Sequence, residues 1–329
     1  MIQTPLNIFY EEPNPDRWFP YDRYPREIIR RIVRGKPRPG GVMMVALELM
    51  RGLDKIGVPY RFNDYKYIKT HPSELACVIG KPQLIFEKRI PNNPILFGAG
   101  IYSHPIECSD LFEKYPNVKK CLVPGEWMRQ MFVHYYGEKV LSWPVGIDTE
   151  KWIPSTNEKT FDVLVYDKIR WEHDHYNTVL LQPIIDYLEK NNLTYCVIKY
   201  GSYKQEDFLE RLNVSKSMIF LCEHETQGLA YQQVLSCNVP IFAWERGGYW
   251  KDPAYYPDRV KYEPVSSVPY WDESCGLKFK DYEEFEGRFD TFFEKVKLNT
   301  FSPRKYILAN LTLEKCAEKY VEIVKNINL

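Results

Sequence analysis

The stretch from Cys222 to Trp244 constrains the fold more than any other part of the chain. It leads from the end of an apolar run through polar residues to a turn at Gly228, then to a helical pattern over 229–236 and a second apolar run over 239–244. A strand, a loop, a helix and a strand within about 30 residues form one βαβ unit. In a parallel sheet, such a unit places its loop and helix N-terminus at the carboxyl edge, where ligands bind. The stretch therefore predicts an anion-binding loop before residue 229.

The spacing inside this stretch carries a family resemblance. Glu225 is followed by Gly228-Leu229, by Gln233 eight residues after the Glu, and by Asn-Val-Pro-Ile at 238–241. This resembles the Glu-x7-Glu signature of the retaining glycosyltransferases of family four, which have the GT-B fold. The signature differs at its second acidic position, where this chain has Gln233. A buried βαβ unit of any function also needs a turn glycine and apolar strands, so this alternative stays open.

The resemblance implies roles for the residues of the motif. Glu225 would contact hydroxyls of a donor sugar, and Gln233 would bind the ribose of the nucleotide through an amide that both accepts and donates hydrogen bonds. The backbone amides of the intervening loop would bind the sugar and the phosphates; these belong to Thr226, Gln227, Gly228 and Leu229.

Composition limits the class of protein. With 329 residues, of which 44% are apolar, the chain is large enough for two domains. The 44 Lys+Arg residues balance the 44 Asp+Glu residues, and this balance argues against a nucleic-acid partner. Eight scattered cysteines without metal-ligand spacing predict reduced core residues of a cytoplasmic protein. We expect no signal peptide and no bilayer-spanning segment, so that any membrane contact would be peripheral.

The N-terminal part is typical of a Rossmann-like domain with an insertion at 11–36. A strand is expected at 6–10, and Gly40-Gly41 precedes a helix expected at 42–53 and a strand at 58–62. This order is similar to the first loop of the same family. The resemblance implies that Gly40 and Gly41 let the backbone approach the donor diphosphate or the acceptor; a simple helix-start turn is the alternative.

Further strands are expected at 76–79, 83–86 and 94–97, and the last leads into a Gly-rich loop that contains His104. A histidine after a strand end is well placed for catalysis or hydrogen bonding. The alternative is a loop histidine that caps local backbone. A strand over 118–124, a helix over 125–131 and the Pro-Val-Gly-Ile-Asp phrase at 144–148 resemble the end of the family's N-terminal domain and its linker.

A second Rossmann-like domain is expected to begin near Thr160 with a strand at 161–166, followed by a loop at 167–170. Lys168 and Arg170 in this loop resemble the cations that neutralise the pyrophosphate of the leaving nucleotide in the family; a solvated surface pair is the alternative. His173 and His175 alternate on a helix and do not share a face, so we expect no metal site.

A strand over 193–200 ends at Tyr200 and Gly201, which by the resemblance lie near the nucleotide base. The aromatic and Pro-rich segment 253–271 either shapes acceptor binding or is a long surface loop. The pattern at 302–320 resembles the family's final helices, which cross back to the first domain.

These observations predict an α/β protein of GT-B fold, in which two Rossmann-like domains face each other across a cleft. The expected domains are an acceptor-side domain at 1–150, a nucleotide-sugar-binding domain at 151–305, and a C-terminal helix at 306–329 that packs back on the first. The implied function is transfer of a sugar from a UDP- or GDP-sugar to a glycan, lipid-linked or other acceptor, with retention and without a metal or other cofactor. A non-catalytic nucleotide-sugar-binding or scaffolding relative, and a nucleotide-sugar epimerase or hydrolase, are the alternatives.

Overall fold

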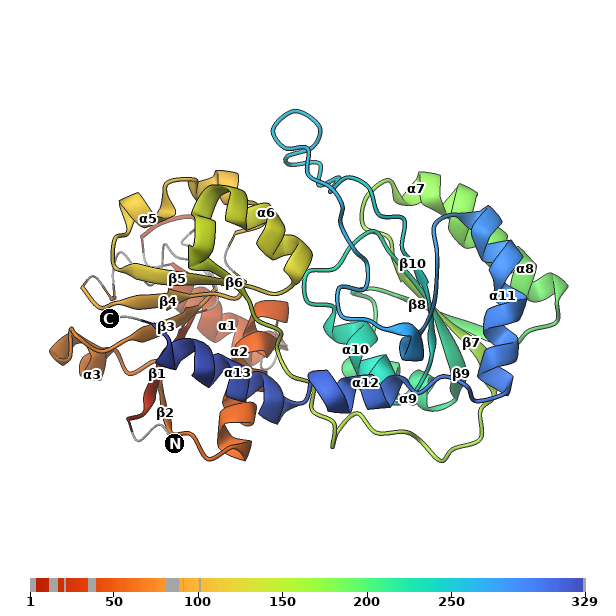
Figure 1. Cartoon of the computed structure of the whole chain (residues 1–329), viewed down its shortest axis with the longest axis horizontal. Helices are drawn as coiled ribbons and strands as arrows, with labels where there is room; N and C mark the ends of the chain where they lie inside the picture. Colours follow the sequence, from red (N-terminus) through yellow and green to blue (C-terminus); the bar gives the residue numbers. More distant parts are fainter. Residues whose placement is uncertain are drawn as a thin grey trace. The chain divides into compact units, whose positions relative to one another are not determined.

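The chain folds into two compact units, each built on a parallel sheet (Figure 1). The computed structural model describes residues 4–11, 17–20, 22–34, 40–80, 89–90, 92–100 and 102–327. Unit 1 comprises Met1–Pro124, Arg129–Val145 and Cys316–Leu329, and unit 2 comprises Gly125–Met128 and Gly146–Lys315. The predicted α/β fold with two parallel-sheet domains is confirmed.

The sheet of unit 1 has the strand order β2-β1-β3-β4-β5-β6, with parallel neighbours throughout. Its central strands are fully buried apolar runs, as expected for a parallel sheet with both faces covered. The predicted strand at 83–86 lies outside the described residues. The strands are β1 (Leu6–Tyr10), β2 (Tyr60–Phe62), β3 (Ala76–Ile79), β4 (Ile95–Phe97), β5 (Val118–Val123) and β6 (Val140–Ser142).

The last helix contributes to unit 1 from Cys316 onward. The buried ring of Trp143 packs edge-on against Tyr320 at a centroid distance of 5.0 Å, and its indole Nε1 donates to the Cys316 carbonyl at 2.9 Å. The helices that lie wholly or partly in unit 1 are α1 (Arg23–Arg34), α2 (Gly41–Lys55), α3 (Tyr65–Thr70), η1 (Pro105–Cys108), α5 (Leu111–Lys114), α6 (Glu126–Tyr136), η2 (Gly137–Lys139) and α13 (Leu313–Lys325).

The sheet of unit 2 has the strand order β11-β10-β9-β7-β8, again with parallel neighbours. Lys168 is the last residue of β7 and pairs in register with Cys222, the last residue of β9. The prediction that residues 167 and 168 begin a loop was wrong, because β7 continues beside the long strand β9. The strands are β7 (Phe161–Lys168), β8 (Tyr195–Lys199), β9 (Ser215–Cys222), β10 (Ile241–Trp244) and β11 (Gly276–Phe279).

Helices cover both faces of this second sheet (Figure 1). On one face, α8 and α11 share a buried apolar cluster with the sheet, in which Phe242 of β10 stacks on Phe292 of α11 at 5.0 Å. On the other, Phe220 of β9 contacts Tyr231 of α10 at 5.7 Å. The helices are α7 (His173–Tyr176), η3 (Asn177–Leu181), α8 (Gln182–Lys190), α9 (Gln205–Asn213), α10 (Leu229–Ser236), η4 (Glu273–Cys275), α11 (Tyr282–Lys297) and α12 (Pro303–Asn310).

The eight cysteines are free thiols, and all of them are buried. Within the described ranges, no helix combines the length and the apolar character that crossing a bilayer requires.

Candidate active site

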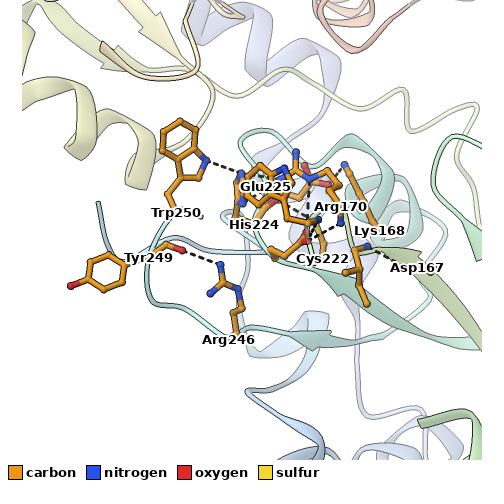
Figure 2. Close-up of polar contacts among 12 residues, drawn as sticks. Asp167, Lys168, Arg170, Cys222, His224, Glu225, Arg246, Tyr249 and Trp250 are labelled. Atoms are coloured by element: carbon orange, nitrogen blue, oxygen red, sulfur yellow. Dashed lines mark hydrogen bonds and ion pairs between the residues drawn. The ribbon is translucent and has the colours of Figure 1, made fainter. Parts of the chain in front are cut away.

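The carboxyl edge of the unit 2 sheet brings two sequence-distant loops together. Lys168 ends β7, and Cys222 ends the neighbouring strand β9 at the same register position. The residues that follow each strand therefore lie side by side: Arg170 follows β7, and His224 and Glu225 follow β9 (Figure 2), together with Glu223, which accepts from the Arg170 N–H. The loop after β9 then leads into α10, as its sequence predicts.

Lys168 and Glu225 form a buried ion pair at this edge. The Lys168 ammonium donates to Oε1 of Glu225, and the two side chains are only 11% and 9% exposed. The ring of Tyr200 lies 4.4 Å from the ammonium, which adds a cation–π contact. Burial by itself lowers the pKa of Lys168, but the neighbouring groups, led by the Glu225 carboxylate, together raise that pKa above its ordinary value. The lysine is therefore a cation at neutral pH.

Glu223 holds the backbone of the loop after β7. Its Oε1 accepts hydrogen bonds from the backbone N–H groups of Arg170 at 2.7 Å and of Trp171 at 2.8 Å. Its second oxygen lies 3.8 Å from Nε of Arg170. One buried carboxylate thus fixes both the backbone and the charge of Arg170 next to β9.

His224 lies at the centre of an aromatic and cationic cluster. Its Nε2 accepts from Nη2 of Arg170 at 2.9 Å and from the Trp250 indole at 3.1 Å, so this nitrogen carries a lone pair. Trp171 stacks on the imidazole at 5.0 Å, and Trp127 meets it edge-on at 5.8 Å. Burial, and then the charge of Arg170, hold the pKa of His224 well below its usual range. The imidazole is therefore neutral.

The backbone of Glu225 is fixed on both sides. Its N–H donates to the Ser266 carbonyl at 2.9 Å, and its carbonyl accepts from the Trp127 indole at 2.8 Å. Ser266 is itself held by Glu245, the residue after β10, to which it donates at 2.6 Å. The direction of the Glu225 side chain thus depends on residues from three separate parts of the chain.

The N-terminus of α10 is formed by Gly228, whose φ of 74° lies in the left-handed region. A Cβ at this position would lie 2.0 Å from the ring of Tyr231, so only glycine fits. The hydroxyl of Tyr231 is in turn anchored by the Tyr270 N–H, which donates to it at 2.9 Å. Glycine offers no side chain to cap the helix, and the first amides of α10 therefore suit an external anion.

A third cation, Arg246, follows β10 at the same edge. Its Nη2 donates to the Tyr249 carbonyl at 2.9 Å (Figure 2), and its buried Nε has no hydrogen-bond partner among the described residues. Its charge also contributes to the lowered pKa of His224. Lys168, Arg170 and Arg246 thus place three cations at this edge, next to the carboxylates of Glu223, Glu225 and Glu245.

Other predicted residues of unit 2 lie around this cluster. Gln233 is half-buried on α10, Tyr200 is half-exposed beside Lys168, and Gly201 follows it with a φ of 80°. His173, considered as a metal ligand, instead lies with its Nε2 2.9 Å from Oδ2 of Asp167. Across the described ranges, no three His, Cys, Asp or Glu side chains are grouped as metal ligands.

The structure places three further predicted site residues in unit 1. Gly40 precedes α2 and Gly41 is its first residue, as expected for a helix-start turn. His104 is buried and caps η1, because its Nδ1 accepts from the Ile106 N–H at 3.0 Å. His104 thus caps local backbone, as the alternative interpretation expected, and its catalytic role stays a prediction.

Sequence reasoning missed several residues of the cluster. His224 directly precedes Glu225, and its position between two glutamates is the local feature that could have identified it. Arg246 and Trp250 lie in the loop after β10, for which the sequence predicts no site residues. The sequence predicts no site role for Trp127 and Trp171, because their contacts with Glu225 and His224 are with residues distant in the chain.

Comparisons with known proteins support the fold. No family model matches the chain, and no curated protein matches its sequence. Among solved structures, AviGT4, "a glycosyltransferase involved in Avilamycin A biosynthesis", superposes with a TM-score of 0.52 at 12% identity, covering 98% of this chain and 97% of that one. The N-terminal domain of Candida albicans trehalose-6-phosphate phosphatase superposes with a TM-score of 0.51 at 13% identity, and the match covers 92% of this chain and 81% of that one.

A third similar structure is longer than this chain. "Accessory secretory protein 1,2 and 3 in Streptococcus pneumoniae" superposes with a TM-score of 0.50 at 15% identity, and the match covers 80% of this chain but 56% of that one. This chain therefore spans little more than half the length of that relative. At such identities the likeness shows the fold, which is the α/β fold of GT-B glycosyltransferase structures with its two parallel-sheet domains.

Proposed function

We propose that the chain is a glycosyltransferase that uses a nucleoside-diphosphate sugar as donor, retains the anomeric configuration and needs no metal. The observation that carries the proposal is the buried Lys168–Glu225 ion pair immediately before the N-terminus of α10. A carboxylate that hydrogen-bonds sugar hydroxyls and a cation that neutralises phosphate are thereby held next to each other.

The cations of this edge match the charge that develops during the reaction. When a glycosidic bond to a diphosphate breaks, negative charge accumulates on the leaving phosphate. Lys168 and Arg170 would stabilise that charge, together with the amides at the start of α10. Side-chain cations supply here the stabilisation that a bound metal ion supplies elsewhere.

The ligand's remaining parts have matching residues. Glu225 would orient the donor sugar through its hydroxyls. Gln233 lies one turn beyond Leu229 on the same side of α10, and its amide would bind the ribose hydroxyls. The half-exposed ring of Tyr200 would pack against the base. Gln233 in place of a carboxylate also favours a second candidate, a protein that binds the nucleotide sugar without turning it over.

The proposal is tested by calorimetric titration of UDP-, GDP- and ADP-sugars into the wild type and into Glu225→Gln and Lys168→Met. Saturable binding of one donor, weakened roughly 30-fold by Lys168→Met through loss of a charge-assisted hydrogen bond, supports the proposal. The matched control is Lys297→Met, which removes a lysine from an exposed ion pair with Glu294 on α11 and leaves binding unchanged.

Binding alone does not separate the two candidates, so donor turnover is measured next. Transfer of the sugar to an added acceptor identifies a transferase, and the anomeric configuration of the product by NMR tests retention. Consumption of the donor without an acceptor identifies a hydrolase or an epimerase. A folded protein that binds none of the donors contradicts the proposal.

A further inference from the structure

Helix α1 and the residues before it expose a large apolar surface. Six apolar side chains in this part of unit 1 are between 52% and 79% exposed to solvent. We call them the exposed apolar stripe; they are Trp18, Phe19, Tyr24, Ile28, Ile29 and Ile32. Several large apolar side chains exposed within one short segment are a candidate interaction site.

The stripe follows helical spacing. Tyr24, Ile28 and Ile32 recur every four residues, which places them on one side of α1. Ile29 lies beside Ile28 and Ile32 on the same side. The regular placement is that of an amphipathic helix rather than of scattered surface apolar residues.

The buried contacts at the start of this helix are polar. Asp22 is almost fully buried and pairs with the buried guanidinium of Arg26 at 3.1 Å. Its carboxylate also accepts from the backbone N–H groups of Arg17 at 3.0 Å and Trp18 at 3.1 Å. The polar residues thus hold the segment in place, while each side chain of the exposed apolar stripe is more than half exposed. This is the reverse of a helix that packs its apolar side on a core.

Positive charge is concentrated in the same segment. Between residues 17 and 34 the sequence has six arginines against the two carboxylates of Asp22 and Glu27, which gives this short stretch a net charge of +4. The whole chain has a formal net charge of zero. A cationic, amphipathic helix preceded by Trp and Phe is the arrangement that lies in the interface of an anionic membrane.

We propose that α1 and residues 17–20 dock on the surface of an anionic lipid bilayer, with the exposed apolar stripe inserted at the level of the headgroups. The concentrated positive charge selects this occupant, since a second copy of the chain would bring two segments of charge +4 together. The apolar stripe distinguishes a bilayer from a polyanion that binds through charge alone. The proposal does not depend on the proposed function, because it concerns a different part of the chain.

The test is flotation of the full chain with phosphatidylcholine vesicles and with vesicles that also contain phosphatidylglycerol. We expect binding to the anionic vesicles only, and a roughly tenfold or larger loss of partitioning in the double variant Ile28→Gln/Ile32→Gln. Both isoleucines are exposed, so the variant should fold as the wild type does, which circular dichroism checks. The matched control is Ile153→Gln/Leu298→Gln, which removes two exposed apolar side chains from unit 2, at 50% and 71% exposure against 60% and 79% for Ile28 and Ile32.

Three outcomes would overturn the proposal. The first is the absence of binding to anionic vesicles. The second is binding that high salt abolishes but the double variant leaves unchanged, which would show adsorption by charge alone. The third is concentration-dependent self-association in analytical ultracentrifugation that the double variant abolishes, which would assign the stripe to a second copy of the chain.

Discussion

The guanidinium of Arg170 lies 2.9 Å from Nε2 of His224, and the indole of Trp250 donates to the same nitrogen at 3.1 Å. Two donors on one imidazole nitrogen require its lone pair. His224 therefore acts as a neutral acceptor that holds Arg170 beside Lys168 and Glu225. A protonated imidazole would repel Arg170 and would lose both hydrogen bonds.

The free energy of unfolding should therefore decrease in acid, because His224 is held neutral in the folded protein. Its pKa is lowered in the folded protein, so the unfolded chain takes up a proton near the ordinary value of 6.5 while the folded chain does not. The contribution is fully present above that value and is lost as the pH falls below it, at up to about 1.4 kcal/mol per pH unit. Urea denaturation at several pH values should show this dependence in the wild type and in the control His134→Gln. An unchanged slope in His224→Gln would contradict the assignment.

The Lys168–Glu225 pair should show strong coupling in a double-mutant cycle. Lys168→Met and Glu225→Gln each leave one buried group without its partner, and each should cost about 3–5 kcal/mol of unfolding free energy. The double variant should cost clearly less than the sum. The cycle is measured by urea denaturation, with Lys297 and Glu294 as the exposed reference pair. Additive costs at the buried pair would show that the two charges act independently.

The Lys168–Glu225 pair should also make the stability of the protein depend on pH in the alkaline range. The pKa of Lys168 is raised, so its stabilising contribution is fully present below the ordinary value of 10.5 and is lost as the pH rises through the raised value. Lys168→Met should remove this part of the alkaline loss of stability. Thermal melts of the wild type and the variant between neutral and alkaline pH measure the difference.

Gly228 should not tolerate a side chain. Gly228→Ala combines a positive φ with a Cβ that would lie 2.0 Å from the ring of Tyr231. Gly57 has a similar φ of 67°, and no described residue beyond its chain neighbours comes within 4 Å of the place that a Cβ would take, so Gly57→Ala reports the backbone strain alone. We expect a cost of about 1 kcal/mol for Gly57→Ala and at least about 2 kcal/mol more for Gly228→Ala. Equal melting temperatures of the two variants would contradict this prediction.

Arg304 should stabilise unit 2 through its planar fork of donors. Nη1 donates to the carbonyls of Trp152 at 2.8 Å and Ser236 at 2.6 Å, and Nη2 donates to that of Thr149 at 3.0 Å. Lysine keeps the charge but cannot reach three carbonyls at once. Arg304→Lys should therefore lower the unfolding free energy by about 2 kcal/mol in urea denaturation. Lys305→Arg, at the next position of α12, serves as the control and should have no effect.

Much of unit 2 followed from local patterns. The predicted bounds of α10, 229–236, agree with the structure, because helical periodicity and the turn glycine before the helix are properties of neighbouring residues. The expected loop at Lys168 was wrong for the opposite reason. Where β7 ends depends on the length of its neighbour β9, which adds pairing partners that local sequence does not show.

The sequence by itself determined the βαβ unit around Glu225, the cations at 168 and 170 and the α/β fold, since each is encoded by residues close together in the chain. Tertiary structure alone decided the surroundings of these groups. Trp127 donates to the backbone of Glu225 from 98 positions away in the sequence, and Trp250 donates to His224 from 26 positions away. Such contacts depend on strand order and loop packing, which bring together residues whose separation in sequence carries no periodic signal.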